Sequence, residues 1–394
     1  MYDAAKLSPW VEMMRSITLL GCFFLLFSVG TSSIAAGKSC EQQVCVAVID
    51  VGSTGSRIHI YSYDLDSTKT PVNITERWVK KISPGFATLT ANQQTINNYL
   101  TSLFIDAPNY ELPTYFYATA GMRLLSKPQQ QLLYTYTQQW FANQTQWQLV
   151  NAKTITGTDE GIYGWLAVNY QLNNLTTNSR PIGVLDMGGA SVQITFPITN
   201  ESATNTNDLQ QIDLYGQHYK LFVHSFLGLG QTEMSHQFLD SEACFDNNYE
   251  MPTGHSAQGD AYKCENEVSS LMNSVHQVNS IVQPVIKSNS INDWYTLGGL
   301  PALAQSKPFD FSEQQLTTQN LLEKANSDVC QQDWTTLNTQ YSGNSYAYGY
   351  CLFPSYYYAL IVDGYGLQPQ QSLHYLSADK SGDWTLGVVL HQQA

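Results

Sequence analysis

Two stretches of the chain share the same order of apolar and polar positions. VCVAVID (44–50) is an apolar run that ends on Asp50, and PIGVLD (181–186) is a second run that ends on Asp186. Each run is followed by a glycine-rich segment and then by an alternating run, SRIHIY (56–61) in the first case and SVQITF (191–196) in the second. An apolar run, a tight turn and an alternating run predict a β-hairpin. The pattern therefore predicts two similar hairpins, each with an acid just before its turn.

The two predicted hairpins also agree in register. Arg57 lies seven residues after Asp50, and Gln193 lies seven residues after Asp186. Because side chains alternate between the two faces of a strand, each hairpin has an apolar face and a polar face. The polar faces hold Arg57, His59 and Tyr61 in the first hairpin and Ser191, Gln193 and Thr195 in the second.

Phosphate and metal binding is the chemistry that suits these turns. Glycines let backbone N–H groups approach phosphate oxygens, and Ser53, Thr54 and Ser191 add hydroxyl donors. Asp50 and Asp186 are suited to hold the waters of a hydrated Mg²⁺ or Ca²⁺ between them. A single Asp-Gly turn is usually only a turn, whereas two copies in matched register favour a shared site. The sequence has no GxxxxGK[ST] motif, which disfavours a P-loop nucleotidase.

The segment GTDEGIYGWLAVNY (157–170) has the spacing of a helix. Thr158 is the expected N-cap, and the apolar positions recur at helical intervals. Asp159 and Glu160 fall in the first turn, where acids interact favourably with the helix dipole. The alternative interpretation is that one of these carboxylates acts as a base toward water.

Two other segments carry candidate substrate contacts. YATAGMRLL (117–125) reads as a strand end that exposes Thr119 and Arg123, and the arginine is either a surface cation or a phosphate clamp. YAYGY (346–350) is an aromatic cluster in a Gly- and Ser-rich loop. Tyr346 and Tyr350 could stack on a nucleobase, although in a chain with 25 tyrosines ordinary surface and core positions are the competing interpretation.

The N-terminus predicts export. Arg15 precedes the apolar run Ile17 to Gly30, and small residues follow at Ala35 and Ala36, as in a secretory signal peptide over 1–36. An uncleaved signal anchor is the alternative, but a span of about 20 apolar residues is usual for a membrane helix. The mature protein is expected to be secreted or periplasmic, with no stable membrane anchor.

Six cysteines follow the predicted signal peptide. An even count in an exported chain favours disulfides, and none of the six lies in a CxxC pair that would suggest zinc. Their spacing suggests the pairs Cys40–Cys45, Cys244–Cys264 and Cys330–Cys351, although six cysteines allow 15 pairings.

Chain length and net charge limit the number of domains and the kinds of function that the protein can have. A chain of 394 residues with 43% hydrophobic positions suggests about two globular domains. Lys and Arg number 18 against 32 Asp and Glu, which gives a net charge of −14. This acidic balance argues against a nucleic-acid-binding protein, which would carry a basic stripe.

The motifs taken together resemble a known family. DVGSTGSRIHIY (50–61), YATAGMRLL (117–125), GTDEGIYGWLAVNY (157–170) and VLDMGGASVQITF (184–196) are similar, in order and spacing, to the first four apyrase conserved regions. DGYGL (363–367) and DWTLGVVL (383–390) resemble the C-terminal region of the same family, the ecto-nucleoside triphosphate diphosphohydrolases (NTPDases). The composition looks most like that of the secreted bacterial (Legionella-type) members.

The resemblance implies an α/β fold made of two actin-like (ribonuclease H-like) domains. Each domain is expected to contain a five-stranded mixed sheet flanked by helices, with the active site in the cleft between the domains. The first domain would comprise 38–156 plus the returning segment 375–394, and the second 157–374. A monomer is expected.

The resemblance also implies roles for individual residues. Glu160 would be the general base, and Ser191 and Gln193 would help to place the attacking water. Asp50 and Asp186 would hold a divalent metal, Mg²⁺ or Ca²⁺ with Mn²⁺ as a further possibility, through its waters. The phosphate contacts would be Ser53, Thr54, Gly55, Ser56, Arg57, His59, Thr119, Arg123, Gly188, Gly189 and Ala190. The substrates would be nucleoside tri- and diphosphates, hydrolysed stepwise to the monophosphate.

Three rival functions share this architecture. An exopolyphosphatase or guanosine pentaphosphatase has the paired loops, but long polyphosphate calls for a basic channel. An actin-like nucleotide switch would bind without fast turnover, which export and Glu160 disfavour. A sugar kinase would need a sugar-binding motif, and none is evident.

Overall fold

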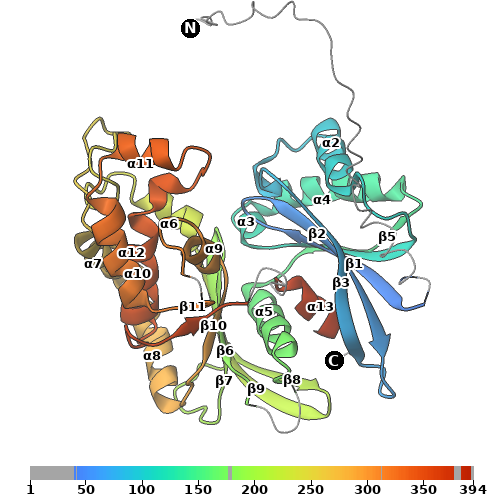
Figure 1. Ribbon diagram of the computed structural model, residues 1–394. Coiled ribbons are helices and arrows are strands. Elements are labelled where there is room, and N and C mark those ends of the chain that lie inside the picture. The colour runs from blue at the N-terminus through green and yellow to red at the C-terminus, as the bar shows by residue number, and fades with distance from the viewer. Residues whose placement is uncertain (1–39, 41, 176–179, 312, 377–382, 392–394) are drawn as a thin grey trace, which may run out of the picture.

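The chain folds around two β-sheets that stand side by side, each with helices on its outer face (Figure 1). The computed structural model describes residues 40, 42–175, 180–311, 313–376 and 383–391. The predicted signal peptide lies outside the described residues. The described part of the chain contains no helix long and apolar enough to cross a membrane.

The first sheet has five strands in the order β3-β2-β1-β4-β5. They are β1 (Val44–Val51), β2 (Ser56–Leu65), β3 (Pro71–Ile82), β4 (Leu112–Ala118) and β5 (Trp147–Thr154). β1 and β2 form the first predicted hairpin, in which Asp50 lies opposite Arg57. β4 and β5 continue the sheet in parallel with β1. The outer face is covered by α2 (Gln93–Phe104) and α4 (Lys127–Ala142), whose first turn carries a Ser126–Gln129 capping box.

The second sheet repeats this order and extends it. Its strand order is β11-β12-β10-β6-β7-β9-β8, and the five strands β9-β7-β6-β10-β12 correspond to β3-β2-β1-β4-β5. The strands are β6 (Gly183–Met187), β7 (Ser191–Pro197), β8 (Leu209–Leu214), β9 (Gln217–Leu227), β10 (Trp294–Gly298), β11 (Gln315–Leu316) and β12 (Leu373–His374).

The expectation of five strands is therefore wrong for the second sheet, which has seven. β8 adds one edge because it forms a hairpin with β9 through Tyr215 and Gly216, both of which have positive φ angles as a tight two-residue turn requires. The two-residue strand β11 adds the other edge by pairing antiparallel with β12.

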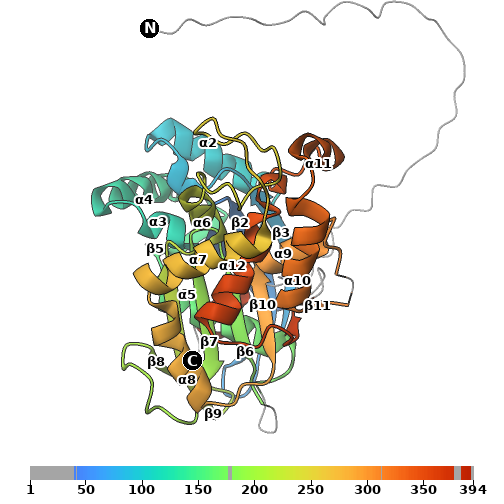
Figure 2. The same ribbon diagram turned by 90° about the vertical axis from the view of Figure 1, so that its left-hand side faces the viewer.

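Most of the remaining helices belong to the second sheet's layer. Viewed from its outer side, α7, α8, α10 and α12 cover that sheet (Figure 2). The helices are α3 (Ala120–Arg123), α5 (Gly157–Gln171), α6 (Gln231–Gln237), α7 (Ala261–Val275), α8 (Val278–Ser288), α9 (Gly299–Gln305), α10 (Thr318–Ala325), α11 (Trp334–Gln340), α12 (Leu352–Tyr358) and α13 (Thr385–His391). Short 3₁₀ segments span Phe86–Thr88 and Ala347–Gly349, and π-helical segments span Asn326–Cys330 and Ala359–Gly364.

Two helices fill the space between the sheets. α5 packs on β6, β7 and β9, and α13 packs on both α5 and β1, so the C-terminal segment returns to the first sheet (Figure 1). The approach is close at Gly387, where a Cβ atom would overlap the Tyr163 carbonyl oxygen. Trp384 stacks on Tyr163 with 6.2 Å between ring centroids. This pair of helices ties the two halves together directly behind the loops that follow β1 and β6.

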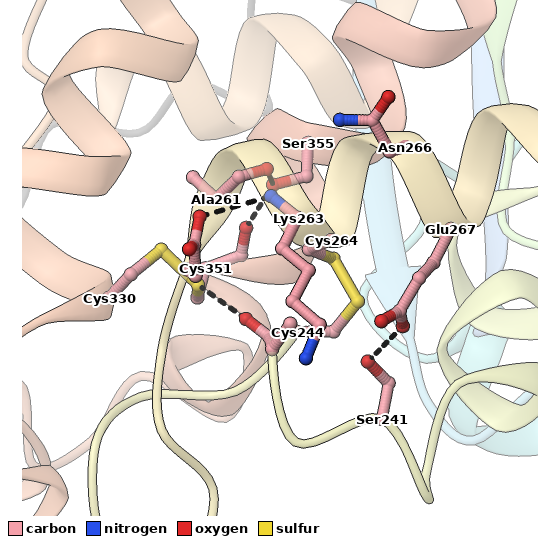
Figure 3. Close-up of a disulfide and its surroundings, with 12 residues drawn as sticks. Ser241, Cys244, Ala261, Lys263, Cys264, Asn266, Glu267, Cys330, Cys351 and Ser355 are labelled. Carbon is pink, nitrogen blue, oxygen red and sulfur yellow. Dashed lines mark hydrogen bonds between the residues drawn. A yellow bond between two sulfur atoms is a disulfide. The ribbon is translucent and has the colours of Figure 1, made fainter.

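The six cysteines form three disulfides, which are Cys40–Cys45, Cys244–Cys264 and Cys330–Cys351. The last two lie close together beside α7 (Figure 3). The Cys330–Cys351 bridge closes the segment that carries α11 and the aromatic cluster 346–350.

Candidate active site

A cleft of about 480 Å³ lies between the sheets and collects most of the predicted site residues. It is lined by the turns after β1 and β6, by α9, by residues of the aromatic segment 344–353, and by Asp383 and Trp384. The predicted residues that line it are Asp50, Ser53, Thr54, Gly55, Ser56, Arg57, Thr119, Glu160, Asp186, Gly188, Gly189, Ala190, Ser191, Tyr346 and Tyr350.

The two glycine-rich turns touch one another in this cleft. A Cβ atom at Gly189 would lie 2.5 Å from Ser53 Oγ and 3.1 Å from Thr232 Oγ1, so only glycine allows the approach. Gly121, at the start of α3, is equally close to Ser53 from another side, because its Cβ would lie 2.9 Å from Ser53 Cα. Three segments therefore pack closely around Ser53, which itself lines the cleft.

Three carboxyl groups line the cleft together. Asp50, the penultimate residue of β1, is half-buried, Asp186 lies in β6 with 8% of its surface exposed, and Glu160 lies in the first turn of α5 with 6% exposed. Burial and the charge of Asp383 raise the pKa of Asp50 to about 8, although Arg57 opposes the rise. Burial, followed by the charges of Glu160 and Asp50, raises the pKa of Asp186. Mutual repulsion of this kind is relieved when a cation binds between the acids.

The residues at this point fit a hydrated divalent cation. Asp50 Oδ1 is buried and accepts no hydrogen bond from the described residues, so it has a free acceptor site. Glycines border the oxygens of Asp186, where Cβ atoms at Gly298 and Gly164 would lie 3.3 and 3.6 Å away. Carboxylate oxygens are the ligands that Mg²⁺ and Ca²⁺ prefer. Within the described ranges, no group of three or more His, Cys, Asp or Glu side chains is arranged to hold a metal directly.

Glu160 is the centre of a polar network. Its Oε2 accepts a hydrogen bond of 3.1 Å from Gln193 Nε2 and forms an ion pair with Arg123. Gln193 Nε2 also lies 2.7 Å from Ser191 Oγ, and Arg123 Nη2 lies 3.3 Å from the same hydroxyl. Burial raises the pKa of Glu160, while Arg123 acts in the opposite direction. Four predicted residues from three separate motifs therefore meet at one carboxylate.

Ser225 belongs to this network and was not predicted. Its Oγ lies 3.0 Å from Gln193 Nε2 and 3.4 Å from Arg123 Nη1, because Ser225 on β9 pairs directly with Gln193 on β7. The sequence signal is the alternation in His224–Leu227, but the strand pairing that brings Ser225 to the site is not visible in the sequence.

Gly157 supports the network from the start of α5. A Cβ atom there would overlap the Ser225 hydroxyl and lie 2.6 Å from Arg123 Nη1. We expect Gly157→Ala to displace both side chains, to lower kcat, and to cost about 1–3 kcal/mol of stability, as overpacking usually does. Gly164→Ala in the same helix is the control for stability, since its Cβ would meet only ordinary contacts of 3.5 and 3.6 Å. Urea unfolding and initial rates of both variants test the prediction, and equal behaviour of the two would contradict it.

The N-cap of α5 is Thr156, so the prediction of Thr158 is wrong. Thr156 Oγ1 accepts from the Asp159 backbone N–H at 3.0 Å, and the Asp159 carboxylate accepts from the Thr156 N–H at 3.1 Å. This capping box starts the helix earlier than predicted, at Gly157. Asp159 is therefore a structural cap, which leaves Glu160 as the first-turn acid that faces the cleft.

His59 does not line the cleft, contrary to its expected place among the phosphate contacts. It is 2% exposed, and its Nδ1 lies 2.5 Å from Glu76 Oε1 while its Nε2 lies 2.7 Å from Asp383 Oδ2. Burial lowers the pKa of His59, but the two carboxylates outweigh this effect and raise it to about 9. His59 is therefore buried between two acids, which favour its protonated form.

Asp383 is a second cleft residue that was not predicted. Its Oδ2 lies 3.2 Å from Arg57 Nη1, and its Oδ1 accepts from the Thr385 backbone N–H. Burial would raise the pKa of Asp383, but His59 and Arg57 hold it below its ordinary value. The segment DWTLGVVL could be recognised in the sequence, whereas its contact with β2 depends on the return of α13 to the first sheet.

The two tyrosines proposed for the nucleobase both line the cleft but differ in exposure. Tyr346 is 44% exposed, while Tyr350 is 1% exposed and packs edge-on against Phe309 and Tyr341. Asn344 Nδ2 donates to the Tyr350 hydroxyl at 2.5 Å. Tyr346 therefore has a free ring surface, and Tyr350 forms part of the rigid wall beside it.

The chain is similar to proteins of known kind along nearly its whole length. The bovine (Bos taurus) ectonucleoside triphosphate diphosphohydrolase 1 is 25% identical over 95% of this chain and 86% of its own length. The crystal structure of nucleoside triphosphate hydrolases from Neospora caninum superposes with a TM-score of 0.61 at 15% identity, covering 91% of this chain and 96% of that one. A Ppx/GppA family member from Aquifex aeolicus superposes with a TM-score of 0.53 at 15% identity, covering 89% and 97%.

Both structural neighbours support the predicted fold of two α/β halves around a cleft. Their low identity limits that evidence to the fold. The family evidence comes from the sequence, where the model of the GDA1/CD39 (nucleoside phosphatase) family matches residues 38–394. The match includes both hairpins, the Glu160 helix and the C-terminal segment with Asp383. The chain therefore belongs to the GDA1/CD39 (nucleoside phosphatase) family.

Proposed function

We propose that the protein is an apyrase, which hydrolyses nucleoside tri- and diphosphates stepwise to the monophosphate and inorganic phosphate. The observation that carries this proposal is the meeting of two glycine-rich turns and three carboxyl groups, two of them buried, in one cleft that is also lined by Tyr346 and Tyr350. The name of the bovine relative, an ectonucleoside triphosphate diphosphohydrolase, supports the same activity.

Glu160 acts as the general base in this mechanism. Its carboxylate is buried beside the Ser191 hydroxyl and the Gln193 amide, and these two groups orient the attacking water toward the terminal phosphorus. Burial, which raises its pKa, makes Glu160 a stronger proton acceptor. No covalent intermediate is required, because phosphoryl transfer depends mainly on positioning and on charge stabilisation.

The phosphate groups lie between the two turns. The contacts are provided by Ser53, Thr54, Gly55, Ser56 and Arg57 from the first turn and the start of β2, Gly188, Gly189 and Ala190 from the second turn, and Thr119 at the N-cap of α3. Arg123 is paired with Glu160 in this structure, and a phosphate oxygen would compete for its guanidinium. A shift of Arg123 toward phosphate would leave Glu160 free to accept the proton of water.

Asp50 and Asp186 would hold a divalent cation, Mg²⁺, Ca²⁺ or Mn²⁺, through its waters. When bound, such a cation neutralises phosphate charge and polarises the P–O bonds. The two carboxylates lie at matching ends of β1 and β6, so a cation between them would connect the two halves of the cleft.

The proposal extends to the organisation of the mature protein. We infer two domains, 38–156 with 375–394 and 157–374, and a monomer that is exported to the periplasm or secreted. The packing of α13 against β1 supports the assignment of the C-terminal segment to the first domain. The three disulfides suit an oxidising compartment.

An exopolyphosphatase or guanosine pentaphosphatase is the second candidate, because the Aquifex aeolicus Ppx/GppA structure shares the fold. The cleft argues against long polyphosphate, since Arg57 and Lys81 are the only Lys or Arg side chains among the described lining residues, which include four acids. A non-hydrolytic nucleotide switch is disfavoured by the buried base at Glu160.

A time course of nucleotide products tests the stepwise reaction. With ATP and Mg²⁺, chromatography should show ATP falling, ADP rising or remaining low, and AMP accumulating together with two phosphates per ATP. Accumulation of ADP as the final product would contradict the diphosphatase step. Release of pyrophosphate would contradict the proposed bond cleavage.

Tyr346→Ala is expected to weaken nucleotide binding. Loss of one stacking face costs about 1–3 kcal/mol, so KM for ATP should rise about tenfold or more while kcat changes little. Inorganic tripolyphosphate has no base and serves as the control substrate, because its KM should not change with this substitution. An equal increase in KM for both substrates would show that Tyr346 acts on the cleft as a whole and not on the base.

A further inference from the structure

Lys81 is a cation of the cleft to which neither the motifs nor the proposed mechanism assigns a role. It lies near the end of β3, lines the cleft and is exposed. Arg57, the other Lys or Arg side chain among the described lining residues, is paired with Asp383, and Arg123, which is not among them, is paired with Glu160. Among the described residues, no hydrogen bond or ion pair is formed by the side chain of Lys81, whose backbone pairs with that of Arg57 in the sheet. Lys81 therefore brings an uncompensated positive charge to the cleft.

The strand register places Lys81 in line with the metal-binding acid. Asp50 on β1 pairs with Arg57 on β2, and Arg57 pairs with Lys81 on β3. Directly paired residues of antiparallel strands project from the same face, so the three side chains form one row across the sheet. With neighbouring strands about 4.8 Å apart, Lys81 lies roughly 10 Å from Asp50 along this row. Partial burial lowers the pKa of Lys81, the charge of Arg57 lowers it further, and the charge of Asp50 opposes both effects. The influence of both residues on Lys81 agrees with their positions in the row.

The end of β3 also borders the first phosphate turn. A Cβ atom at Gly55 would overlap the Ile82 carbonyl oxygen, and one at Gly85 would overlap the Ser53 carbonyl oxygen. The turn 52–55 is therefore packed directly on the segment that follows Lys81. A phosphate bound by this turn would therefore lie near Lys81.

We propose that Lys81 binds a phosphate group of the substrate at the outer end of the row formed by Asp50, Arg57 and Lys81. The inference rests on the proposed function, because it extends the phosphate site of the same cleft. A lysine ammonium is a compact, mobile point charge and a common phosphate ligand. Since Arg57 is held by Asp383, Lys81 supplies positive charge without first breaking an ion pair.

The test compares Lys81→Gln with Lys80→Gln. Lys80 is the neighbouring residue and points to the opposite face of β3, where its Nζ donates to the Ile105 carbonyl at 2.8 Å and lies 3.8 Å from Asp106. Both changes remove one positive charge from adjacent positions. Binding of a non-hydrolysable ATP analogue with Mg²⁺ is measured by calorimetry, and KM and kcat are measured with ATP.

We expect Lys81→Gln to weaken analogue binding and to raise KM about tenfold, as the loss of a charged hydrogen bond does, with kcat within about threefold. Lys80→Gln should change neither value by more than about twofold, and Lys81→Arg should recover most of the affinity. Equal effects of the two Gln variants, or no effect of Lys81→Gln, would overturn the inference. A wild-type protein that binds the analogue but releases no phosphate would contradict the proposed function and leave the binding comparison valid.

Discussion

Replacing Glu160 by Gln is expected to reduce kcat by a factor of about 10²–10⁴, the usual contribution of a general base. The amide keeps the size of the side chain and an acceptor for Gln193 Nε2, but it cannot take a proton from water. Nucleotide binding should remain within a few-fold of wild type, because the base approaches water and not the bound phosphates. Steady-state phosphate release and calorimetric binding of ATP measure the two effects separately.

Asp159→Asn is the matched control for this variant. Asp159 lies in the same turn, but its carboxylate caps α5 through Thr156, a role that asparagine can perform. Its kcat should stay within about threefold of wild type. Thermal unfolding of both variants is needed as well, since Glu160→Gln also leaves Arg123 without its ion pair. Full activity of Glu160→Gln in a folded protein would exclude this residue as the base.

The second large effect is expected at the metal site. Asp186→Asn should weaken the apparent affinity for Mg²⁺ about 10–100-fold, the range observed when a group that holds a metal indirectly is changed. Activity at low Mg²⁺ should therefore fall sharply and recover in part as the concentration is raised. In the wild type, a chelator should abolish turnover, and added Mg²⁺ or Ca²⁺ should restore it.

Titration of activity against Mg²⁺ for wild type and variant is the measurement. Asp208→Asn provides a control, since Asp208 is paired with His224 on β9 and does not line the cleft. Its Mg²⁺ dependence should match that of the wild type. A chelator-resistant wild type, or an unchanged Mg²⁺ dependence in Asp186→Asn, would contradict the role of these acids.

The local parts of the site could be predicted from the sequence because short-range patterns determine them. The alternation in SRIHIY and the turn after Asp50 are sufficient to place Arg57 opposite that acid, as the β1–β2 register has it. The turn after Asp186 and the alternation in SVQITF place Gln193 opposite Asp186 in the same way, as the β6–β7 register has it. Both pairs depend only on a hairpin, whose register follows from its turn.

The residues that were missed depend on contacts between distant segments. Ser225 reaches Gln193 through the pairing of β7 with β9, and Asp383 reaches Arg57 and His59 across more than 300 positions of the chain. The alternation of side chains along the strand correctly predicted that His59 shares a face with Arg57. It could not predict that Glu76 and Asp383 enclose the His59 ring. Edge strands such as β8 were missed because hairpin pairing at a sheet edge adds no distinctive motif.

The acidic composition of the chain is compatible with a polyphosphate substrate. Asp50, Glu160 and Asp186 account for part of the acidic excess, and all three line the cleft. The negative charge of a nucleotide would be met locally by the backbone of two turns, by a divalent cation and by the side chains of Arg57 and Lys81. The net charge of the whole chain argues against a nucleic-acid groove, but it does not indicate how this cleft would bind a small polyphosphate.

The most direct test of the central claim is phosphate release by the wild-type protein from ATP, ADP and inorganic polyphosphate, each with and without Mg²⁺. A nucleoside triphosphate diphosphohydrolase releases phosphate from both nucleotides only when a divalent cation is present, and it shows little or no release from long polyphosphate. Release from polyphosphate alone would contradict the proposed function and assign this cleft to an exopolyphosphatase.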